Sequence, residues 1–436
     1  MEIKELQDII QQNGVVGAGG AGFPTYMKLT DKANTILMNC AECEPLLKLH
    51  RQLLEKHAYE IMKTFHMIQE TVGASEAIIG IKKSYVQTIH ALNQHIEEFP
   101  GMRLHLLDEV YPMGDEVVLI YEATGRVVRP GGLPIEQGVA VFNVETVYNV
   151  YRAVEEKQPV TDKYVSVVAE VSDPVTVRVP LGCTLEEVVA QAGSTTVKDP
   201  VYFVGGPMMG RIGNGSDPVT KTTNAILVLP KDHLIVAKKQ RTSSIDLKRA
   251  ASICCQCNTC TDLCPRHNLG HPIDPAKFMR AASNNDFRDL NPYIDASFCS
   301  SCGVCEMYSC PQSLAPRSLL ADMKGGLRKA GIRPPQGVQP KPVQESREYR
   351  KVPEEGLTRY DKDAPLKEEL VQVKKVRILL SQHIGAPAQA VVKAGDEVTR
   401  GQMIAQPAQG LSVGIHASVS GKVTEVTDRY IIIAVK

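Results

Sequence analysis

The 436-residue sequence has no Trp and only 14 Tyr and 8 Phe, and it has no excess of either charge, because 49 Lys and Arg balance 49 Asp and Glu. Nucleic-acid-binding proteins usually show a basic excess or stripe, so this balance argues against that class. No apolar run approaches the roughly 18–20 residues that span a bilayer. The start, MEIKELQDII, lacks the pattern of a signal peptide. We therefore expect a cytoplasmic protein without a transmembrane segment.

Cysteine is abundant, and its distribution is informative. Eight of the 12 Cys fall into two clusters with metal-ligand spacing. Thiols remain reduced in the cytosol, so such clusters indicate metal or redox sites rather than a disulfide framework. The other four, Cys40, Cys43, Cys183 and Cys255, have no assigned role.

The two cysteine clusters have the spacing of iron–sulfur ligands. The first run is C-x2-C-x2-C-x3-C-P and the second is C-x2-C-x2-C-x4-C-P. In two-cluster ferredoxins, the fourth cysteine of each run binds the other cluster. We therefore expect a first cysteine set, holding one 4Fe–4S cluster, of Cys254, Cys257, Cys260 and Cys310. The second cysteine set, holding the other cluster, is Cys299, Cys302, Cys305 and Cys264. The alternative is a pair of zinc sites, but zinc ribbons rarely show three successive cysteines at this spacing.

Hydrophobic patterning divides the chain into parts of different character. Residues 1–158 alternate strand-like runs with helical periodicity, typical of an α/β layer with a mainly parallel sheet. The expected strands there are 35–39, 77–82 and 104–107, and the expected helices are 46–72, 85–98, 115–124 and 145–154. The parts that follow are an α+β module at 159–236, a cysteine-rich helical part at 244–330, a linker at 331–369 and an all-β domain at 370–436.

A glycine-rich segment, GAGGAG at 17–22, precedes Phe23 and Lys28. Such a loop lets the backbone approach an anion or a flat ring, but alone it could be a tight turn. Three further segments place polar residues at strand ends or helix starts, where ligands lie in open α/β sheets. They are NCAECEP at 39–45, YPMGDE at 111–116 and FNVET at 142–146.

These motifs, in this order, resemble the flavin- and NADH-binding subunit of respiratory complex I. They resemble still more closely the RnfC component of the Rnf electron-transport complex and the cobalamin reductases of propanediol-utilisation operons. The VGGPMMG run at 204–210 resembles the end of a soluble-ligand-binding β-grasp (SLBB) module. Residues 382–426 resemble the barrel-sandwich hybrid module of RnfC, placed last here as in the cobalamin reductases. The resemblance implies a complex I flavin-subunit-like α/β domain, an SLBB domain, a ferredoxin-like two-cluster domain and a barrel-sandwich hybrid.

The resemblance also implies roles for individual residues. Contacts to FMN phosphate and ribityl are implied for Gly17, Gly19, Gly20 and Lys28. The resemblance further implies that the flavin is lined by Asn39, Glu42, Gly114, Asn143 and Thr146. For NADH, it implies stacking by Phe23 and hydrogen bonds from the catalytic residues Glu44 and Glu116. The alternative for the acidic residues is that they stabilise helix N-termini.

The function implied is electron transfer from NADH through FMN and two 4Fe–4S clusters to an acceptor, which we expect to be a corrinoid. One alternative is an adaptor, like RnfC, that feeds another reductase. Another is a non-catalytic module that binds cobalamin or a related ligand. The resemblance implies a location in a bacterial microcompartment or at the periphery of a membrane complex. The turn at 420–422 lacks the Met-Lys pair of a carrier lysine, so we expect the last domain to be structural or to mediate docking.

Overall fold

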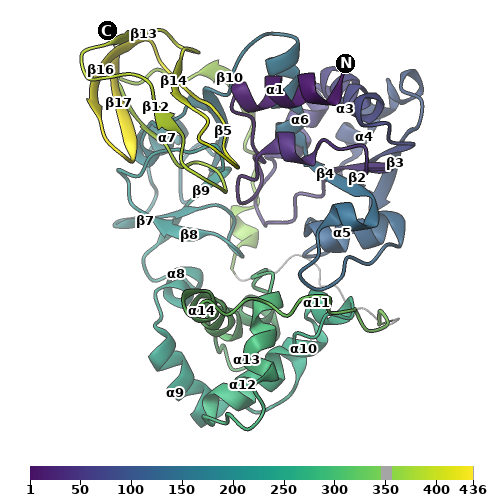
Figure 1. Ribbon diagram of the computed structural model, residues 1–436. Coiled ribbons are helices and arrows are strands. Elements are labelled where there is room, and N and C mark those ends of the chain that lie inside the picture. The colour runs from purple at the N-terminus through teal and green to yellow at the C-terminus, as the bar shows by residue number, and fades with distance from the viewer. Residues whose placement is uncertain (345–355, 436) are drawn as a thin grey trace.

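The structure is a computed structural model that describes residues 1–344 and 356–435. An α/β domain and two β-rich parts form the upper half in Figure 1, and a helical part that carries both cysteine runs forms the lower half. Within the described ranges, no helix has both the length and the apolar character needed to cross a membrane.

The first domain is built on a four-stranded parallel sheet with strand order β3-β2-β1-β4. The strands are β1 (Thr35–Cys40), β2 (Glu76–Lys82), β3 (Met102–Leu107) and β4 (Val139–Asn143). Its inner strands are almost entirely buried on both faces, as expected for a parallel sheet covered by helices. The α/β class and the three strands expected from the sequence are confirmed.

Helices cover both faces of this sheet. One face packs against α1 (Ile3–Gln12), α2 (Leu49–Lys56), α3 (Ala58–Val72), α4 (Val86–Asn93) and α6 (Val144–Val154). The other face packs against α5 (Glu116–Thr124), which faces the lower half of the molecule (Figure 1). The single helix expected over 46–72 is wrong, because the chain leaves helical geometry at His57. There the imidazole stacks on Tyr148 and hydrogen-bonds Glu368, contacts that a continuous helix pattern does not reveal.

The second sheet is mixed and has strand order β10-β6-β5-β9-β7-β8. Its strands are β5 (Asp162–Ala169), β6 (Val175–Pro180), β7 (Pro200–Val204), β8 (Arg211–Gly213), β9 (Ala225–Pro230) and β10 (Leu366–Leu370). The short helix α7 (Leu185–Val189) begins with the capping box expected at Thr184 and Glu187. Of the expected linker 331–369, residues 345–355 lie outside the described residues. Its end is not linker, since β10 pairs with β6.

The helical part has a small core of its own, built around Phe278, Met279, Leu319 and Leu320. Its helices are α8 (Leu234–Lys239), α9 (Ser243–Ile253), α10 (Thr259–Asp262), α11 (Pro265–Asn268), α12 (Pro275–Ser283), α13 (Asn291–Ile294) and α14 (Pro316–Lys329). A single π-helical turn covers Cys305–Ser309. Most of these helices are short, so the loops between them determine where the cysteines lie.

The C-terminal part consists of two small sheets packed face to face around one core, which confirms the all-β expectation. One sheet contains β11 (Lys375–Leu379), β13 (Glu397–Val398), β16 (Gly421–Val426) and β17 (Tyr430–Val435). The other contains β12 (Gln389–Ala390), β14 (Met403–Gln406) and β15 (Ile415–His416). Gly421 and Lys422 pair with β13 and β17. A Cβ at Gly421 would lie 2.1 Å from the Ala434 carbonyl oxygen, so this close approach requires glycine.

Candidate redox centres

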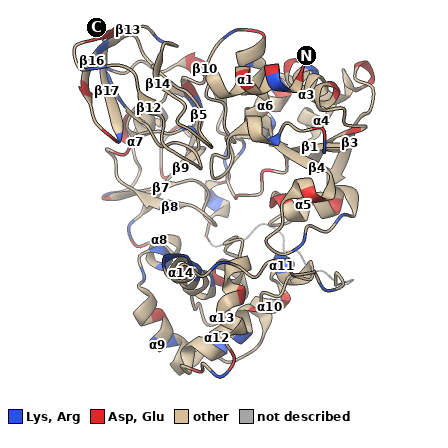
Figure 2. Ribbon diagram, in the orientation of Figure 1, with Lys and Arg blue, Asp and Glu red and all other residues tan. Residues whose placement is uncertain are grey.

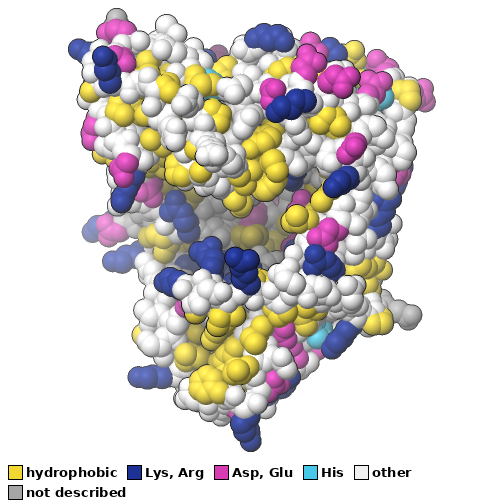
Figure 3. Space-filling model, viewed as in Figure 1, with side chains coloured by type: hydrophobic (Ala, Val, Ile, Leu, Met, Phe, Trp, Pro, Cys, Tyr) yellow, Lys and Arg dark blue, Asp and Glu magenta, His cyan; other side chains and the backbone are white. Residues whose placement is uncertain are grey.

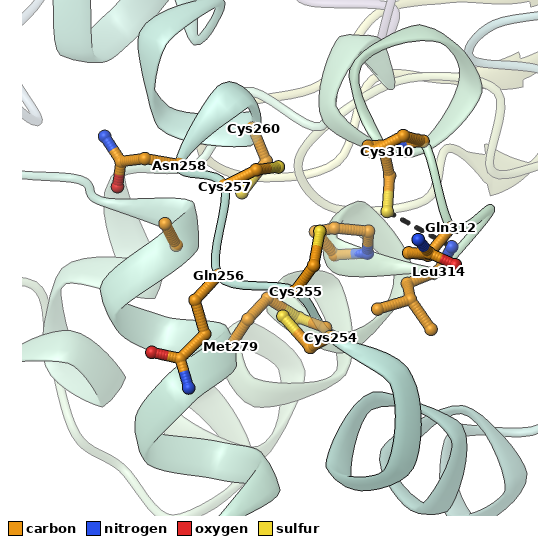
Figure 4. Close-up of a pocket in the computed structure, with 13 residues that line it drawn as sticks. Cys254, Cys255, Gln256, Cys257, Asn258, Cys260, Met279, Cys310, Gln312 and Leu314 are labelled. Carbon is orange, nitrogen blue, oxygen red and sulfur yellow. Dashed lines mark hydrogen bonds between the residues drawn. The ribbon is translucent and has the colours of Figure 1, made fainter.

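The two cysteine runs meet in two separate cavities. One cavity is lined by the first cysteine set, with Cys310 facing the loop that carries Cys257 and Cys260 (Figure 4). The other is lined by the second cysteine set, Cys264 together with Cys299, Cys302 and Cys305. Each cavity therefore takes three cysteines from one run and the fourth from the other, which is the crossed arrangement predicted from the spacing.

Both cysteine loops have the same backbone geometry. Gln256 and Asn258 in the first loop have positive φ, of 54° and 68°. Ser301 and Gly303 occupy the corresponding positions in the second loop, with φ of 59° and 87°. Non-glycine residues rarely adopt this conformation, so its repetition shows that both loops are tightly wound.

Backbone amides of these loops point at the sulfur atoms. Ser301 N–H donates to Cys299 Sγ at 3.3 Å, and Leu314 N–H donates to Cys310 Sγ at 3.4 Å. Such hydrogen bonds are among the factors that set the reduction potential of an iron–sulfur cluster.

Burial makes these thiols costly to ionise unless a cation is present. It raises the pKa of Cys260 and of Cys302 to about 12, and it also raises that of Cys305 well above its usual value. Metal ligation requires thiolates, so bound iron would supply the compensating positive charge. No three Cys, His, Asp or Glu side chains in the described parts of the chain are arranged to hold a single metal ion. The two four-cysteine cavities fit 4Fe–4S clusters.

The glycine-rich loop precedes the first strand and presents open backbone. Its base is closed by Gly17 N–H, which donates to the Phe23 carbonyl oxygen at 2.9 Å. Ala18 N–H donates to Thr146 Oγ1 at 2.9 Å. Gly19 and Gly20 are exposed, and a Cβ at Gly19 would lie 2.6 Å from Asn143 Nδ2. The loop therefore offers a side-chain-free surface beside Asn143 and Thr146, which fits a flat or anionic ligand.

Asn143 caps α6, which begins directly after β4. Its Oδ1 accepts hydrogen bonds from Glu145 N–H at 3.0 Å and Thr146 N–H at 3.4 Å. Its amide nitrogen lies 3.2 Å from His50 Nε2. His50 has no role among the predictions from sequence. Only the tertiary fold brings α2 beside the end of β4, so no sequence signal could have identified this residue.

Glu42 is a buried carboxylate beside the same loop. Its Oε2 accepts a hydrogen bond from His50 N–H at 3.1 Å, while Oε1 has no hydrogen-bond partner among the described residues and lies 3.6 Å from His50 Nδ1. Burial raises the pKa of Glu42 to about 7 and lowers that of His50 to about 3. A buried carboxylate oxygen without a hydrogen bond is unusual, and it suits a site in which a ligand completes the hydrogen bonding.

We expect Glu42→Gln to change how stability depends on pH. The folded protein holds a proton on Glu42 up to about pH 7, whereas the unfolded chain loses it near 4.5. Between these values this group therefore lowers the free energy of unfolding as pH rises, by up to about 1.4 kcal/mol per unit. Glutamine does not titrate. Thermal unfolding at pH 5 and pH 8 should show Glu42→Gln gaining stability relative to wild type at the higher pH, and a constant difference would contradict this prediction.

Asn39 and Gly114 join the end of β1 to the loop before α5. Asn39 Nδ2 donates to the Gly114 carbonyl oxygen at 2.9 Å. A Cβ at Gly114 would lie 2.6 Å from the Ala41 carbonyl oxygen, so the two loops touch through backbone. Both residues therefore lie at the carboxyl edge of the sheet, where the sequence predicted them.

Lys28 and Glu116 come together on the open side of this edge. Lys28 Nζ donates to the Val141 carbonyl oxygen at 2.6 Å and lies 3.4 Å from Glu116 Oε1. The Glu116 side chain is 43% exposed, so its carboxylate can reach a ligand. Phe23 is half-buried at the end of the glycine-rich loop.

Glu44 lies apart from this pair and joins the first two domains. Its two carboxylate oxygens accept hydrogen bonds from Met208 N–H and Met209 N–H, both at 2.9 Å. A Cβ at Gly206 would lie 2.1 Å from Glu44 Oε2, which explains the glycine at this position. Burial raises the pKa of Glu44 to about 7. Of these two carboxylates, that of Glu116 is the one open to solvent, and the catalytic roles of both Glu44 and Glu116 stay predictions.

Two polar contacts join the first domain, residues 1–158, to the second cysteine set; we call it the flavin-type domain because of the resemblance of its motifs. The Tyr111 hydroxyl donates to the Cys302 carbonyl oxygen at 2.6 Å. Asp115, the N-cap of α5, pairs with Arg266 at 2.9 Å, and Arg266 lies two residues after Cys264. The second cysteine set is thus held directly against the loop that carries Gly114 and Glu116. Spacing in the sequence does not reveal these contacts, because they join residues about 150 to 190 positions apart.

A hollow separates the upper and lower halves of the molecule (Figure 3). Lys and Arg side chains gather along its lower edge, over α8 and α14, while α5 above carries acidic residues (Figures 2 and 3). Lys239 of α8 donates to the Met208 carbonyl oxygen at 3.1 Å, and burial lowers its pKa to about 8. A basic edge of this kind favours an anionic ligand such as a dinucleotide.

Comparison with known families accounts for three parts of the chain. Residues 10–152 match the Nuo51 FMN-binding domain, residues 253–315 match the 4Fe–4S dicluster domain, and residues 358–436 match the RnfC barrel sandwich hybrid domain. The chain therefore contains an FMN-binding domain and a 4Fe–4S dicluster domain.

Individual relatives extend over the whole chain. Cobalamin reductase PduS of Salmonella typhimurium is 42% identical over 435 residues, covering 98% of this chain and 96% of that protein. The chain belongs to the cobalamin reductase family. A second member, cobalamin reductase PduS of Citrobacter freundii, is 40% identical over 438 residues, covering 99% of this chain and 96% of that protein. The resemblance stated from the motifs is thereby confirmed.

More distant proteins are similar to parts of this chain. A component of the Na(+)-translocating ferredoxin:NAD(+) oxidoreductase complex of Acetobacterium woodii is 29% identical over 286 residues, covering 64% of this chain and 61% of that protein. Two structures of an NAD+-reducing NiFe hydrogenase, H2-reduced and air-oxidised, align with TM-scores of 0.50 and 0.51. Their identities are 21% and 20%, over 77% of this chain and 64% and 68% of theirs, so they show a shared fold.

Proposed function

We propose that the protein is an NADH-dependent oxidoreductase that delivers electrons to a corrinoid. The observation that carries the proposal is the direct attachment of the second cysteine set to the flavin-type domain, through Tyr111 to Cys302 and Asp115 to Arg266. This attachment gives electrons a short route out of the flavin site. The name of the relatives, cobalamin reductase, supports a corrinoid as acceptor.

The reaction balances without an added oxidant or reductant. One NADH supplies two electrons and releases NAD+ and one proton, and two cob(II)alamin molecules each gain one electron to become cob(I)alamin. When bound, the flavin would supply two-electron chemistry toward NADH and the clusters one-electron chemistry toward the acceptor. The chain itself supplies orientation, separation of the centres and exclusion of water.

We assign the open glycine backbone, Asn143 and Thr146 to the flavin, together with Asn39, Glu42, Gly114 and Lys28. Phe23 and Glu116 border the open side of this site, where NADH would approach. The module at 159–236 is in our proposal an SLBB domain, anchored to the flavin-type domain by Glu44. A bacterial microcompartment is the proposed location.

The test is anaerobic mixing of the purified, reconstituted protein with NADH in a stopped-flow instrument. NADH should bleach the iron–sulfur absorbance, and added cob(II)alamin should then convert to cob(I)alamin faster than with NADH alone. An absence of corrinoid reduction above this background would refute the proposed acceptor.

The second candidate function is that of an adaptor that feeds another reductase. It is favoured by the match of residues 358–436 to the RnfC barrel sandwich hybrid domain and by the similarity to the Acetobacterium protein. In this case NADH bleaches the clusters but cob(II)alamin is not reduced. A non-catalytic ligand-binding module would show neither response.

A further inference from the structure

The two cysteine sets occupy unequal positions in the fold. The second set lies under α5, tied to the flavin-type domain by Tyr111 and Asp115. The cavity of the first set is lined only by residues between 254 and 316, and it lies at the junction of α9, α10 and α12, toward the lower end of the molecule (Figure 1). Cys257 of this set is exposed. The first set is therefore the one placed to pass electrons out of the protein, because electron tunnelling falls steeply with distance.

A second hollow, of about 960 Å³ and distinct from the one between the two halves of the molecule, lies beside the first cysteine set. Gln256 lines both the cysteine cavity and this hollow, so the two adjoin at this residue. The remaining walls come from Lys277, Arg280 and Ala281 of α12 and from residues between 284 and 292. Small-molecule sites typically enclose about 300–1,000 Å³, so this hollow has room for a large cofactor.

The lining of the hollow combines an exposed aromatic ring with the side chain of Arg280. Phe287 is 62% exposed and stacks on Tyr293, with ring centroids 5.3 Å apart and an interplanar angle of 23°. This stacking holds the ring in place while leaving it open to solvent, and hydrophobic side chains gather at this lower end of the molecule (Figure 3). An exposed aromatic ring of this kind can stack on a flat ligand.

The charged residues around Phe287 leave one cation available. Lys277 pairs with Asp289 at 2.8 Å, and Arg288 pairs with Asp286 at 2.7 Å. In the described part of the chain, no carboxylate lies within ion-pair distance of Arg280. Its charge helps to lower the pKa of Asp274, but its guanidinium is in no close ion pair and can bind the phosphate or amide oxygens of a ligand.

We propose that the hollow is the docking site of the corrinoid, with the corrin ring against Phe287 and its phosphate or amide groups at Arg280. This proposal rests on the proposed function. A corrinoid has a flat ring system with amide side chains and a nucleotide phosphate, which matches the aromatic and cationic lining. The first cysteine set would hold the centre that supplies one electron, originally from NADH, to each docked cob(II)alamin, which would become cob(I)alamin without taking up a proton.

The proposal is tested with Phe287→Ala and Arg280→Gln in the reconstituted full-length protein. Neither residue is one of the cysteines expected to bind a cluster, so iron content, flavin content and NADH-driven bleaching should stay at wild-type levels. Reduction of hexacyanoferrate(III), a small inorganic electron acceptor that needs no corrinoid site, should also be unchanged. The KM for cob(II)alamin should rise about tenfold in each variant, equivalent to about 1.4 kcal/mol of lost binding.

The matched control is Val86→Ala, which truncates an exposed hydrophobic residue of the flavin-type domain, 69% exposed. It should keep the wild-type KM. If wild type reduces cob(II)alamin and both hollow variants keep its KM, the docking site is wrong while the proposed function stands. If wild type itself reduces no cob(II)alamin, the proposed function fails, and the docking site fails with it.

Discussion

Replacing Cys310 by alanine is expected to remove the iron held by Cys254, Cys257 and Cys260, although Cys310 follows the other cysteine run in the sequence. The structure places Cys310 in the cavity of the first set. Iron should fall from about eight to about four atoms per chain, because one of two four-iron clusters is lost. Iron and sulfide analysis, with electron paramagnetic resonance of the reduced protein, measures the loss.

Double variants distinguish crossed from uncrossed ligation. In the crossed arrangement, Cys257→Ala adds no further iron loss to Cys310→Ala, since both remove the same cluster. Cys302→Ala added to Cys310→Ala should remove nearly all iron. The reverse pattern would show that each run binds its own cluster. Cys255→Ala, in the same exposed loop but without an assigned role, is the matched control and should retain all the iron.

Gly19→Val is expected to abolish flavin retention while leaving the iron–sulfur part intact. A Cβ at this position would lie 2.6 Å from Asn143 Nδ2, which is too close. The two methyl groups of valine would in addition occupy the side-chain-free surface that we assign to the flavin. We expect flavin affinity to fall at least about tenfold, a loss of roughly 1.4 kcal/mol or more. Flavin released on denaturation, measured by fluorescence per chain, provides the readout.

Iron content serves as the internal control for folding, because the cysteine sets lie in a separate part of the chain. The matched glycine control is Gly325→Ala in α14, where an added Cβ meets no atom within 4 Å. It should keep both flavin and iron. Full flavin occupancy in Gly19→Val would contradict the assignment of the glycine-rich loop to the flavin.

Expectations from local sequence are most accurate where short segments determine the geometry. The capping box at Thr184 and Glu187 is such a case, because both hydrogen bonds close within one helical turn. Asp115 and Asn143 are likewise N-caps of the helices expected after them. The parallel strands are recognisable because both of their faces are buried, so each is a continuous apolar run.

Expectations fail where a distant contact decides the local structure. The helix expected over 46–72 breaks at His57, whose partners Tyr148 and Glu368 are remote in sequence. The segment Leu366–Leu370 is short and polar, so the sequence predicts a linker there. In the structure it forms an edge strand of the second sheet, next to β6. Short polar segments form edge strands only when a sheet edge is available, and that is a property of the whole fold.

The sequence by itself determined the types of centre in this protein. Cysteine spacing is a local constraint on which sulfur atoms one loop can present, and the glycine-rich run is a local constraint on how closely a ligand can approach the backbone. Only the tertiary structure decided how these centres are arranged. It placed His50 beside Asn143, engaged Glu44 with the second domain, and set the second cysteine set against the flavin-type domain. The physical reason is that these contacts join residues far apart in the chain, so they exist only after the domains have packed.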